Sequence, residues 1–409
     1  MKVLLINKFY YIKGGSERVF FNTKELLEKN GHQVICFSMK DSRNLPSSYE
    51  KYFVPYVDFQ NKKKWLRKVL RFIYFKKSAK SLAQLIAQEK PDIAHLHNIS
   101  HQITPAILKP LKKLNIPVVQ TLHDYQIICP NYRLFNKDKV CEKCFQHKYY
   151  KCTINKCVQE QCLPSLLSSL ELYHQWVGKY YKEKVDLFIS PSKFLKDKVL
   201  DWGLERPIEV LPNFLKVANF EPDYNNDNYI LFVGRLSQEK GLLSLLSAMK
   251  ELPNINLKVV GDGPEKIKVQ RYISINKLNN VDYLGAQYGE DLVSLIKKSK
   301  FVVVPSTWYE NYPILVIEAM ALGKPVLASR LGGLVEMVKE NETGWFFEAG
   351  NSQDLQMKIK QNYNSENLKL LGKNARAQVE KMNCANKHYV ELIKIYNRLV
   401  NKSNSLNLG

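Results

Sequence analysis

The feature that most constrains the fold is a series of short apolar segments that alternates with helix-like stretches and occurs twice along the chain. In the first series the segments are apolar throughout and lie at residues 2–7, 33–38, 93–97, 117–121 and 187–190. The second series comprises residues 208–211, 229–233, 257–260, 301–305 and 325–328. Segments of this kind are typical of parallel strands whose sheet is covered by helices on both faces. Two such series predict two doubly wound α/β domains.

Composition limits the class of protein further. Apolar residues make up 45% of the 409 residues and charged residues 24%, which is ordinary for globular proteins and excludes extensive disorder. No apolar run approaches the roughly 20 residues of a membrane-spanning helix, and residues 3–6 are too short for a secretory signal. We therefore expect a cytoplasmic protein with domains at residues 1–205 and 206–385, followed by a helix and tail at 386–409.

The charge of the chain is unevenly distributed. The 61 Lys and Arg residues against 39 Asp and Glu leave a net charge of +22. Residues 1–200 hold 35 basic and 16 acidic side chains and account for +19 of it. A domain this basic favours an anionic partner. We expect no nucleic-acid partner, because the second half is almost neutral and the chain has no finger, RNP or helix-turn-helix signature.

Two carboxylates, Glu310 and Glu318, lie around a predicted helix start. A polar, aromatic loop carries Glu310, and Pro313 suits the first helical position because it has no N–H to bond. The helix N-terminus would offer N–H groups to a diphosphate, with Glu318 roughly 8 Å along the axis. The carboxylates are candidates for binding the hydroxyl groups of a ribose and a sugar. The alternative is that Glu318 caps a neighbouring loop and Glu310 is solvated.

A second candidate anion site follows the segment at residues 229–233. A turn at Gly234 precedes Arg235 and Lys240. Arginine suits bidentate contacts with phosphate, and lysine supplies a point charge. The alternative is a solvated turn with two ordinary cations. Gly261 lies in a further glycine loop at a strand end, which lacks the GxGxxG pattern.

The first domain has its own candidates at strand ends. Gly14 and Gly15 open the first helix, where glycines allow the backbone to approach an anion closely. His123 follows the strand at residues 117–121 and would lie at the same edge of the sheet. The alternatives are a plain strand-to-helix turn at the glycines and a structural histidine.

Taken in order, these segments resemble the retaining glycosyltransferases of family 4, which have the GT-B fold of two Rossmann-like domains facing a central cleft. The resemblance covers residues 3 to about 380. The matching motifs are Gly14-Gly15-x-Glu17-Arg18, His97, His123-Asp124, VLPN at 210–213, Gly234-Arg235, Lys240-Gly241, Gly261-Asp-Gly263 and Glu310-x7-Glu318.

The resemblance implies a nucleotide-sugar donor held mainly by the carboxyl domain. Glu318 would bind the ribose, and Glu310 the hydroxyl groups of the donor sugar. Arg235 and Lys240 would neutralise the leaving diphosphate, and His123 would contact the sugar near the reacting carbon. The expected donor site is completed by Gly14, Gly15, Gly234, Gly261, Asn311, Tyr312 and Pro313. The final helix at residues 386–400 would cross back to the first domain.

The implied reaction is transfer of a sugar with retained anomeric configuration. Fixed positive groups stabilise the charge that develops on the diphosphate. No Asp-x-Asp motif is present, so we expect metal-independent catalysis by same-face attack, with no cofactor required. UDP- and GDP-sugars are both open as donors. A nucleotide-sugar epimerase of the same fold and a non-catalytic membrane-binding scaffold are the alternative functions.

A basic amphipathic segment at residues 61–80 carries nine cations. Such a segment is typical of helices that bind anionic membrane surfaces. The residues expected to contact the membrane are Lys62, Lys63, Lys64, Trp65, Arg67, Lys68 and Arg71. We expect peripheral association with the inner face of the plasma membrane and a lipid-linked saccharide acceptor in cell-surface polysaccharide synthesis. The alternative is a core-facing helix with a solvated basic face.

Six of the eight cysteines fall in an insertion at residues 129–162. Cys141 and Cys144 have the spacing of zinc ligands, and Cys152 and Cys157 follow at wider intervals. A structural zinc and reduced thiols are both open here. Disulfides are less favoured, because no secretory signal is expected.

Overall fold

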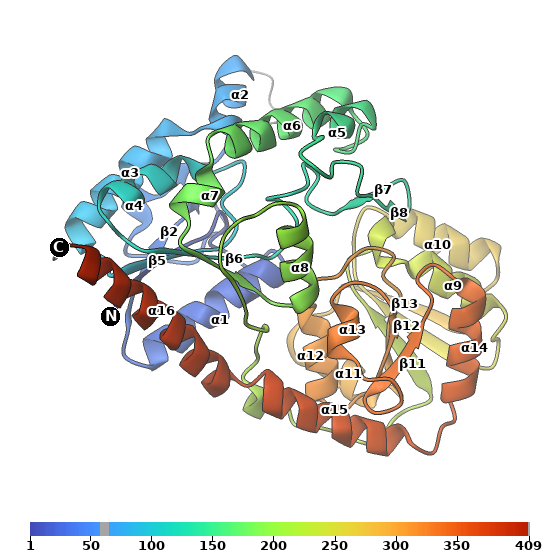
Figure 1. Cartoon of the computed structure of the whole chain (residues 1–409). Coiled ribbons are helices and arrows are strands. Elements are labelled where there is room, and N and C mark those ends of the chain that lie inside the picture. The colour runs from blue at the N-terminus through green and yellow to red at the C-terminus, as the bar shows by residue number, and fades with distance from the viewer. Residues whose placement is uncertain (58–64, 408–409) are drawn as a thin grey trace. The chain divides into compact units, whose positions relative to one another are not determined.

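The structure is a computed structural model that describes residues 1–57 and 65–407. It divides into two compact units, each with its own parallel sheet (Figure 1). The first unit comprises Met1–Leu134, Glu142–Leu211 and His388–Gly409, and the second comprises Phe135–Cys141 and Pro212–Lys387.

The first unit is built on six parallel strands in the order β10-β9-β6-β5-β1-β2. The strands are β1 (Lys2–Ile6), β2 (Gln33–Phe37), β5 (Ile93–Leu96), β6 (Val118–Thr121), β9 (Leu187–Ser190) and β10 (Ile208–Val210). Its helices are α1 (Gly15–Lys29), α2 (Trp65–Ile73), α3 (Lys76–Glu89), α4 (Leu108–Lys113), α5 (Tyr150–Ile154), α6 (Cys162–Val177), α7 (Tyr180–Lys184) and α8 (Lys193–Asp201). The short strands β3 (Met39–Lys40) and β4 (Val54–Pro55) pair with each other outside the sheet.

The strand at 208–210 belongs to the first sheet, not to the second series as the sequence predicted. β10 pairs in parallel with β9, so that Ile208 lies opposite Phe188. The division between the units therefore falls between Leu211 and Pro212, whereas the predicted boundary was at residues 205 and 206. The reason is that an apolar segment shows its strand character locally, but only pairing decides which sheet it joins.

The second unit contains six parallel strands in the order β13-β12-β11-β14-β15-β16. They are β11 (Tyr229–Val233), β12 (Asn256–Val260), β13 (Val281–Gly285), β14 (Val302–Val304), β15 (Val326–Ser329) and β16 (Gly344–Phe347). The helices are α9 (Leu242–Lys250), α10 (Lys266–Ile275), α11 (Gly289–Lys298), α12 (Ile314–Ala321), α13 (Leu334–Met337), α14 (Ser352–Asn362) and α15 (Leu368–Met382). The hairpin of β7 (Phe135–Asn136) and β8 (Lys139–Val140), from the predicted cysteine insertion, is part of this unit.

The last helix, α16 (Ala385–Asn407), joins the first unit from His388 onward. Its residues Leu392 and Tyr396 are fully buried in the same core as Leu5 and Phe20, and Figure 1 shows α16 beside α1. The Tyr396 hydroxyl lies 2.6 Å from Nδ1 of His95 on β5. Apolar burial and this hydrogen bond together hold the helix on the first sheet.

Among the described residues, no helix combines the length and the apolar character needed to cross a bilayer.

Candidate functional site

The second unit has a topological switch point between β11 and β14. These strands are neighbours, but β11 is followed along the chain by β12 on one side, and β14 by β15 on the other. Ligands of doubly wound sheets bind at the carboxyl ends of the strands at this point. The Thr307 N–H donates to the carbonyl of Glu239 at 2.9 Å, which joins the two loops that leave these strands.

Gly241 makes the close approach of these two loops possible. Its φ of +68° lies in the left-handed region, and a Cβ atom would come within 1.8 Å of the Pro305 carbonyl oxygen. Only glycine accommodates both conditions without displacing the backbone. The Lys240-Gly241 pair is therefore a structural unit, in which the glycine brings the lysine to the end of β14.

Lys240 and Glu310 form an ion pair across the switch point. Lys240 Nζ lies 2.6 Å from Glu310 Oε1, and Ser306 Oγ donates to the same oxygen at 2.6 Å. Burial alone raises the pKa of the Glu310 carboxyl. The charge and hydrogen bond of Lys240, with the hydrogen bond from Ser306, outweigh burial and hold the pKa below its ordinary value. Glu310 is therefore an anion at neutral pH.

Arg235 presents a contrasting cation at the end of β11. Its side chain is exposed and forms no hydrogen bond or ion pair with any other described residue. Gly234, immediately before it, passes close to Gly261 at the end of β12, where a Cβ atom would meet the Gly234 carbonyl oxygen at 1.8 Å. The two predicted glycines thus pack against each other, and the arginine is left open to an anion.

The predicted carboxylate on α12 lies as the sequence indicated, but one neighbour has another role. Glu318 is the fifth residue of α12 and is buried, and Pro313 directly precedes the helix. Tyr312 is buried rather than open to a donor. Its carbonyl accepts from Asn213 Nδ2 at 2.9 Å, and its hydroxyl from Asn383 Nδ2 at 3.1 Å. These contacts support the loop that carries Glu310 and Asn311.

In the first unit, His123 belongs to a row of stacked histidines at the ends of β5 and β6. His97 Nδ1 lies 2.8 Å from His123 Nε2, and the rings of His97 and His95 stack at 4.6 Å. Burial lowers the pKa of His123 to about 4 and that of His95 to about 3. It also holds the pKa of His97 well below its ordinary value. All three rings are neutral at pH 7, so His123 and His97 share an N–H···N hydrogen bond and neither carries a fixed charge.

Gly14 and Gly15 lie at the start of α1, as predicted. Gly14 is the residue before the helix and has an extended backbone. The first turn also holds Glu17, which is buried and accepts a hydrogen bond from Ser16 Oγ at 3.0 Å. An anion bound here would share the helix N-terminus with this carboxylate.

Only part of the predicted membrane segment can be compared with the structure. Lys62, Lys63 and Lys64 lie outside the described residues, and α2 begins at Trp65, with side chains described from Lys68 onward. Arg71 differs from the prediction, because its guanidinium packs 3.8 Å from the centre of the Phe75 ring and bonds the Pro55 carbonyl. Burial lowers its pKa to about 10. Arg71 therefore anchors α2 to its own unit.

Three of the four predicted zinc ligands, Cys144, Cys152 and Cys157, lie near one another. Among the described residues, no group of three or more His, Cys, Asp or Glu side chains could hold a metal ion. A hydrogen bond with Cys157, together with burial, raises the pKa of the Cys152 thiol. A structural zinc needs four ligands converged on the ion, so zinc binding by these cysteines stays a prediction.

Three contributors to the second unit's site were not predicted from the sequence. Ser306 and Trp308 both contact the Lys240–Glu310 pair, Trp308 with its ring centre 5.3 Å from the lysine nitrogen. The Gly333 N–H donates to the carbonyl of Glu310 at 2.6 Å. The position of Ser306, four residues before Glu310, could have indicated the first contact. The Gly332-Gly333 pair carries no local signal of its proximity.

Comparison with family models divides the chain at nearly the same place as the structure. Residues 13–218 match a model described as Glycosyltransferase Family 4, and residues 216–378 match one described as Glycosyl transferases group 1. The first model alone covers half of the chain.

Three curated relatives are similar to parts or most of the sequence. An uncharacterized glycosyltransferase of Methanocaldococcus jannaschii is 35% identical over 201 residues, 48% of this chain and 56% of its own length. An uncharacterized protein of a Klebsiella pneumoniae cps region is 26% identical over 85% of this chain and 90% of its own. The capsular polysaccharide biosynthesis glycosyltransferase CapM of Staphylococcus aureus is 28% identical over 55% of this chain and 66% of its own.

Solved structures show the same fold at low sequence identity. The sucrose-phosphate synthase of Thermosynechococcus elongatus superposes with a TM-score of 0.72 at 18% identity, covering 97% of this chain and 98% of its own. The Anabaena protein HepE in complex with UDP gives a TM-score of 0.67 at 18% identity, with 97% and 100% covered.

Proposed function

Because the chain belongs to glycosyltransferase family 4 and has the GT-B fold of two Rossmann-like units, we propose that it transfers a sugar from a nucleotide-sugar donor to a saccharide acceptor in cell-surface polysaccharide synthesis. The observation that carries this proposal is the Lys240–Glu310 pair at the switch point of the second unit, beside an Arg235 that has no partner among the described residues. The pair supplies a carboxylate for sugar hydroxyl groups, and Arg235 supplies a cation for a diphosphate.

The charges of the second unit favour different roles for Arg235 and for the Lys240–Glu310 pair. Arg235 is exposed and ready to bind a leaving diphosphate, while Lys240 is already neutralised by Glu310. A donor that accepts a hydrogen bond from Lys240 would draw it from Glu310 and release this carboxylate to the sugar. Glu318, on α12, would bind the ribose. Positive groups held in place before the reaction stabilise the diphosphate as its charge develops.

The reaction that we propose is same-face displacement with retention of configuration and without a catalytic metal. It rests on the family resemblance and on the absence of an Asp-x-Asp motif from the sequence. His123, neutral at pH 7, would donate a hydrogen bond near the reacting carbon. A uridine nucleotide is the first donor to test, because UDP is bound in the similar Anabaena structure.

We propose that the acceptor is lipid-linked and lies at an anionic membrane surface. Exposed apolar side chains support it, since α2 contacts α6 and both helices leave leucines open to solvent. Leu70 of α2 is 69% exposed, and Leu163, Leu166 and Leu170 form a stripe along α6. Apolar side chains within a strongly basic unit suit a surface of anionic headgroups over acyl chains.

The first experiment measures thermal stabilisation by a panel of UDP- and GDP-sugars in the presence of EDTA. A donor at a hundred times its dissociation constant adds about 2.7 kcal/mol to the unfolding free energy. We expect one donor to stabilise the wild type and to lose this effect in Arg235→Ala and Glu318→Ala. Arg271→Ala removes another exposed arginine of the same unit and should leave the effect intact.

Three outcomes would contradict the proposal. Equal stabilisation of wild type and Arg235→Ala by the donor would show that Arg235 does not bind the diphosphate. Conversion of the donor to an isomer without an acceptor would indicate an epimerase. Binding to anionic vesicles with no response to any donor would indicate a scaffold.

A further inference from the structure

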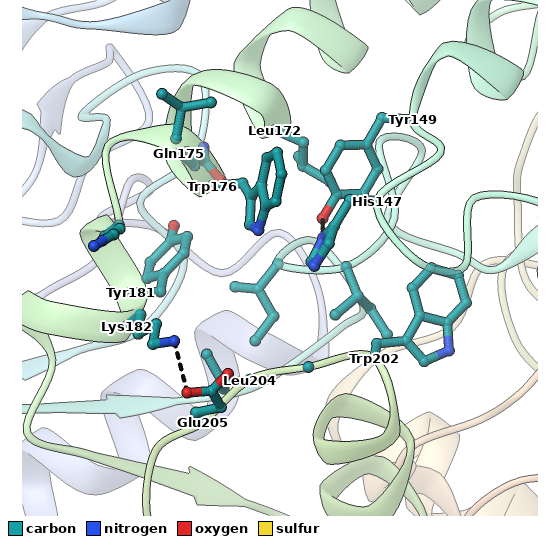
Figure 2. Close-up of a pocket in the computed structure, with 15 residues that line it drawn as sticks. His147, Tyr149, Leu172, Gln175, Trp176, Tyr181, Lys182, Trp202, Leu204 and Glu205 are labelled. Carbon is teal, nitrogen blue, oxygen red and sulfur yellow. Dashed lines mark hydrogen bonds and ion pairs between the residues drawn. The ribbon is translucent and has the colours of Figure 1, made fainter.

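The first unit contains a pocket of about 580 Å³ that neither His123 nor Gly14 lines (Figure 2). The loop after β6, the loop before α5, the end of α6 with α7, and the turn after α8 form its walls. Its volume lies within the range of roughly 300–1,000 Å³ that small-molecule sites occupy.

One wall of the pocket is an aromatic surface. The Trp176 indole stacks on the ring of His147 with centroids 4.6 Å apart, and the Tyr149 hydroxyl bonds His147 Nδ1 at 3.0 Å. Figure 2 shows Trp176 beside His147, with Trp202 at the same pocket. Trp176 is nevertheless 51% exposed. An indole that is held by a stack and still open to solvent offers an ordered apolar face to a ligand.

The pocket also holds a buried amide without a partner. Gln175 is 4% exposed, and neither its side-chain oxygen nor its nitrogen forms a hydrogen bond with any described residue. A buried amide is costly unless its N–H groups find an acceptor and its oxygen finds a donor. A ligand that fits Gln175 must therefore offer both, as a hydroxyl group does.

Each charged residue that lines the pocket has an ion-pair partner. Lys182 Nζ lies 2.6 Å from Glu205 Oε2, and Lys179 lies 3.5 Å from Glu183 one helical turn away. These pairs leave little net charge at the pocket for an anionic ligand. An uncharged ligand with an apolar face and several hydroxyl groups matches the lining best.

We propose that this pocket is a saccharide-binding subsite, in which Trp176 stacks on the C–H face of a neutral sugar and Gln175 hydrogen-bonds its hydroxyl groups. The inference rests on the proposed function and deepens it, since the sugar would belong to the acceptor chain. The loop after β6 connects the two places, because His123 and the pocket residues Ile127 and Ile128 lie on it. An acceptor held here would be anchored by sugars away from its reacting end.

The test is titration calorimetry of the full chain with neutral oligosaccharides (maltotriose, lactose, chitotriose and mannotriose) and, separately, with UDP and GDP. We expect at least one oligosaccharide to bind with UDP present as well as without it. Trp176→Ala and Gln175→Met should weaken this binding at least tenfold and leave nucleotide binding unchanged. Gln175→Met replaces an unpartnered amide with an apolar chain of similar length, so loss of folding is not expected. Tyr288→Ala, which removes an exposed aromatic ring of the second unit, is the matched control.

The outcomes separate the subsite from the proposed function. Nucleotide binding with no oligosaccharide binding, or with oligosaccharide binding equal in wild type and both pocket variants, would overturn the subsite alone. Loss of binding to neutral detergent micelles in Trp176→Ala, with no saccharide bound, would assign the pocket to an acyl chain instead. If neither nucleotides nor nucleotide sugars bind, the proposed function fails and the inference fails with it.

Discussion

In the second unit, a buried carboxylate is kept ionised by the residues that contact it. Glu310 is 5% exposed, yet its ion pair with Lys240 and the hydroxyl of Ser306 keep it ionised. A buried pair of this kind contributes little net stability, because desolvation of both charges offsets their attraction. The ion pair instead holds a carboxylate and an ammonium group at a defined separation in the loops beside the exposed Arg235.

Glu310→Gln is expected to lower the unfolding free energy by about 1–3 kcal/mol at pH 7, because it leaves the partly exposed Lys240 without its charged partner. The lowered pKa of Glu310 means that its stabilising effect is full above the pKa of the unfolded chain, near 4.5, and is lost as pH falls through the folded value. Urea unfolding from pH 7 to pH 3.5 measures both effects. Glu366→Gln, at an exposed site, should unfold as the wild type does. If Glu310→Gln also unfolds as the wild type does, the ion pair of Glu310 with Lys240 does not contribute to stability.

The buried histidines of the first unit also make the unfolding free energy depend on pH. Here the folded protein stabilises the neutral form of the side chain, whereas at Glu310 it stabilises the charged form. Burial lowers the pKa of His95 to about 3 and that of His123 to about 4, so the folded protein keeps both neutral where the unfolded chain binds protons. Stability is therefore full above about pH 6.5 and falls as pH drops toward 4, by about 1.4 kcal/mol per pH unit for each histidine. Imidazole NMR resonances should show no titration of these rings near pH 6.5. A midpoint near 6.5 would exclude the neutral stack.

At the scale of elements, the site of the second unit depends on two strand ends being held together. The loops after β11 and β14 meet because Gly241 lets backbone approach backbone. In the first unit, the element that closes the core is α16, which arrives from the far end of the chain and buries Leu392 and Tyr396. Both arrangements depend on contacts between segments that are distant in sequence.

Gly241→Ala is expected to separate these two loops and to weaken donor binding at least tenfold, because its Cβ atom would overlap the Pro305 carbonyl. Gly289→Ala is the matched control, since this glycine also has a positive φ, +57°, but has open space around its Cβ position. It should show only the cost of the left-handed backbone, about 1 kcal/mol. Thermal stabilisation by the donor measures the first effect and urea unfolding the second. Similar behaviour of the two variants would show that the loop contact is unimportant.

At the scale of the whole molecule, the charge is concentrated in the first half of the chain. Residues 1–200 hold 35 basic and 16 acidic side chains, while the rest of the chain is almost neutral. The first unit also presents the exposed leucines of α2 and α6. We therefore expect the first unit to meet an anionic partner and the second to bind the nucleotide.

Binding to vesicles that contain phosphatidylglycerol is expected to fall steeply between 0.1 and 0.5 M salt, because screening weakens the attraction of lysines to anionic headgroups. Joint replacement of Lys62, Lys63 and Lys64 by glutamine should lower vesicle binding at least tenfold. Replacement of the exposed Lys277, Lys360 and Lys369 of the second unit is the control with equal loss of charge. Cosedimentation measures the vesicle binding of both variants. An equal loss of binding in the two would show that net charge, and not the position of these lysines, causes the binding.

Much of the fold and part of the site were predictable from the sequence, because the signals are local. Uninterrupted apolar segments indicated parallel strands, and the motifs around Gly234, Lys240 and Glu310 indicated the loops at the strand ends. These features depend on residues within one segment. The motifs in series also indicated the family, which the family models confirm.

The tertiary structure alone decided which segments meet. It assigned residues 208–210 to the first sheet, paired Lys240 with Glu310 across 70 positions, and turned Arg71 inward onto Phe75. It also brought Cys152 next to Cys157 and left the side-chain amide of Gln175, beside Trp176, without a partner among the described residues. The physical reason is that strand and helix character arises from neighbours along the chain. Ion pairs, burial and pockets arise from packing between distant segments, where each contact depends on the position of all the others.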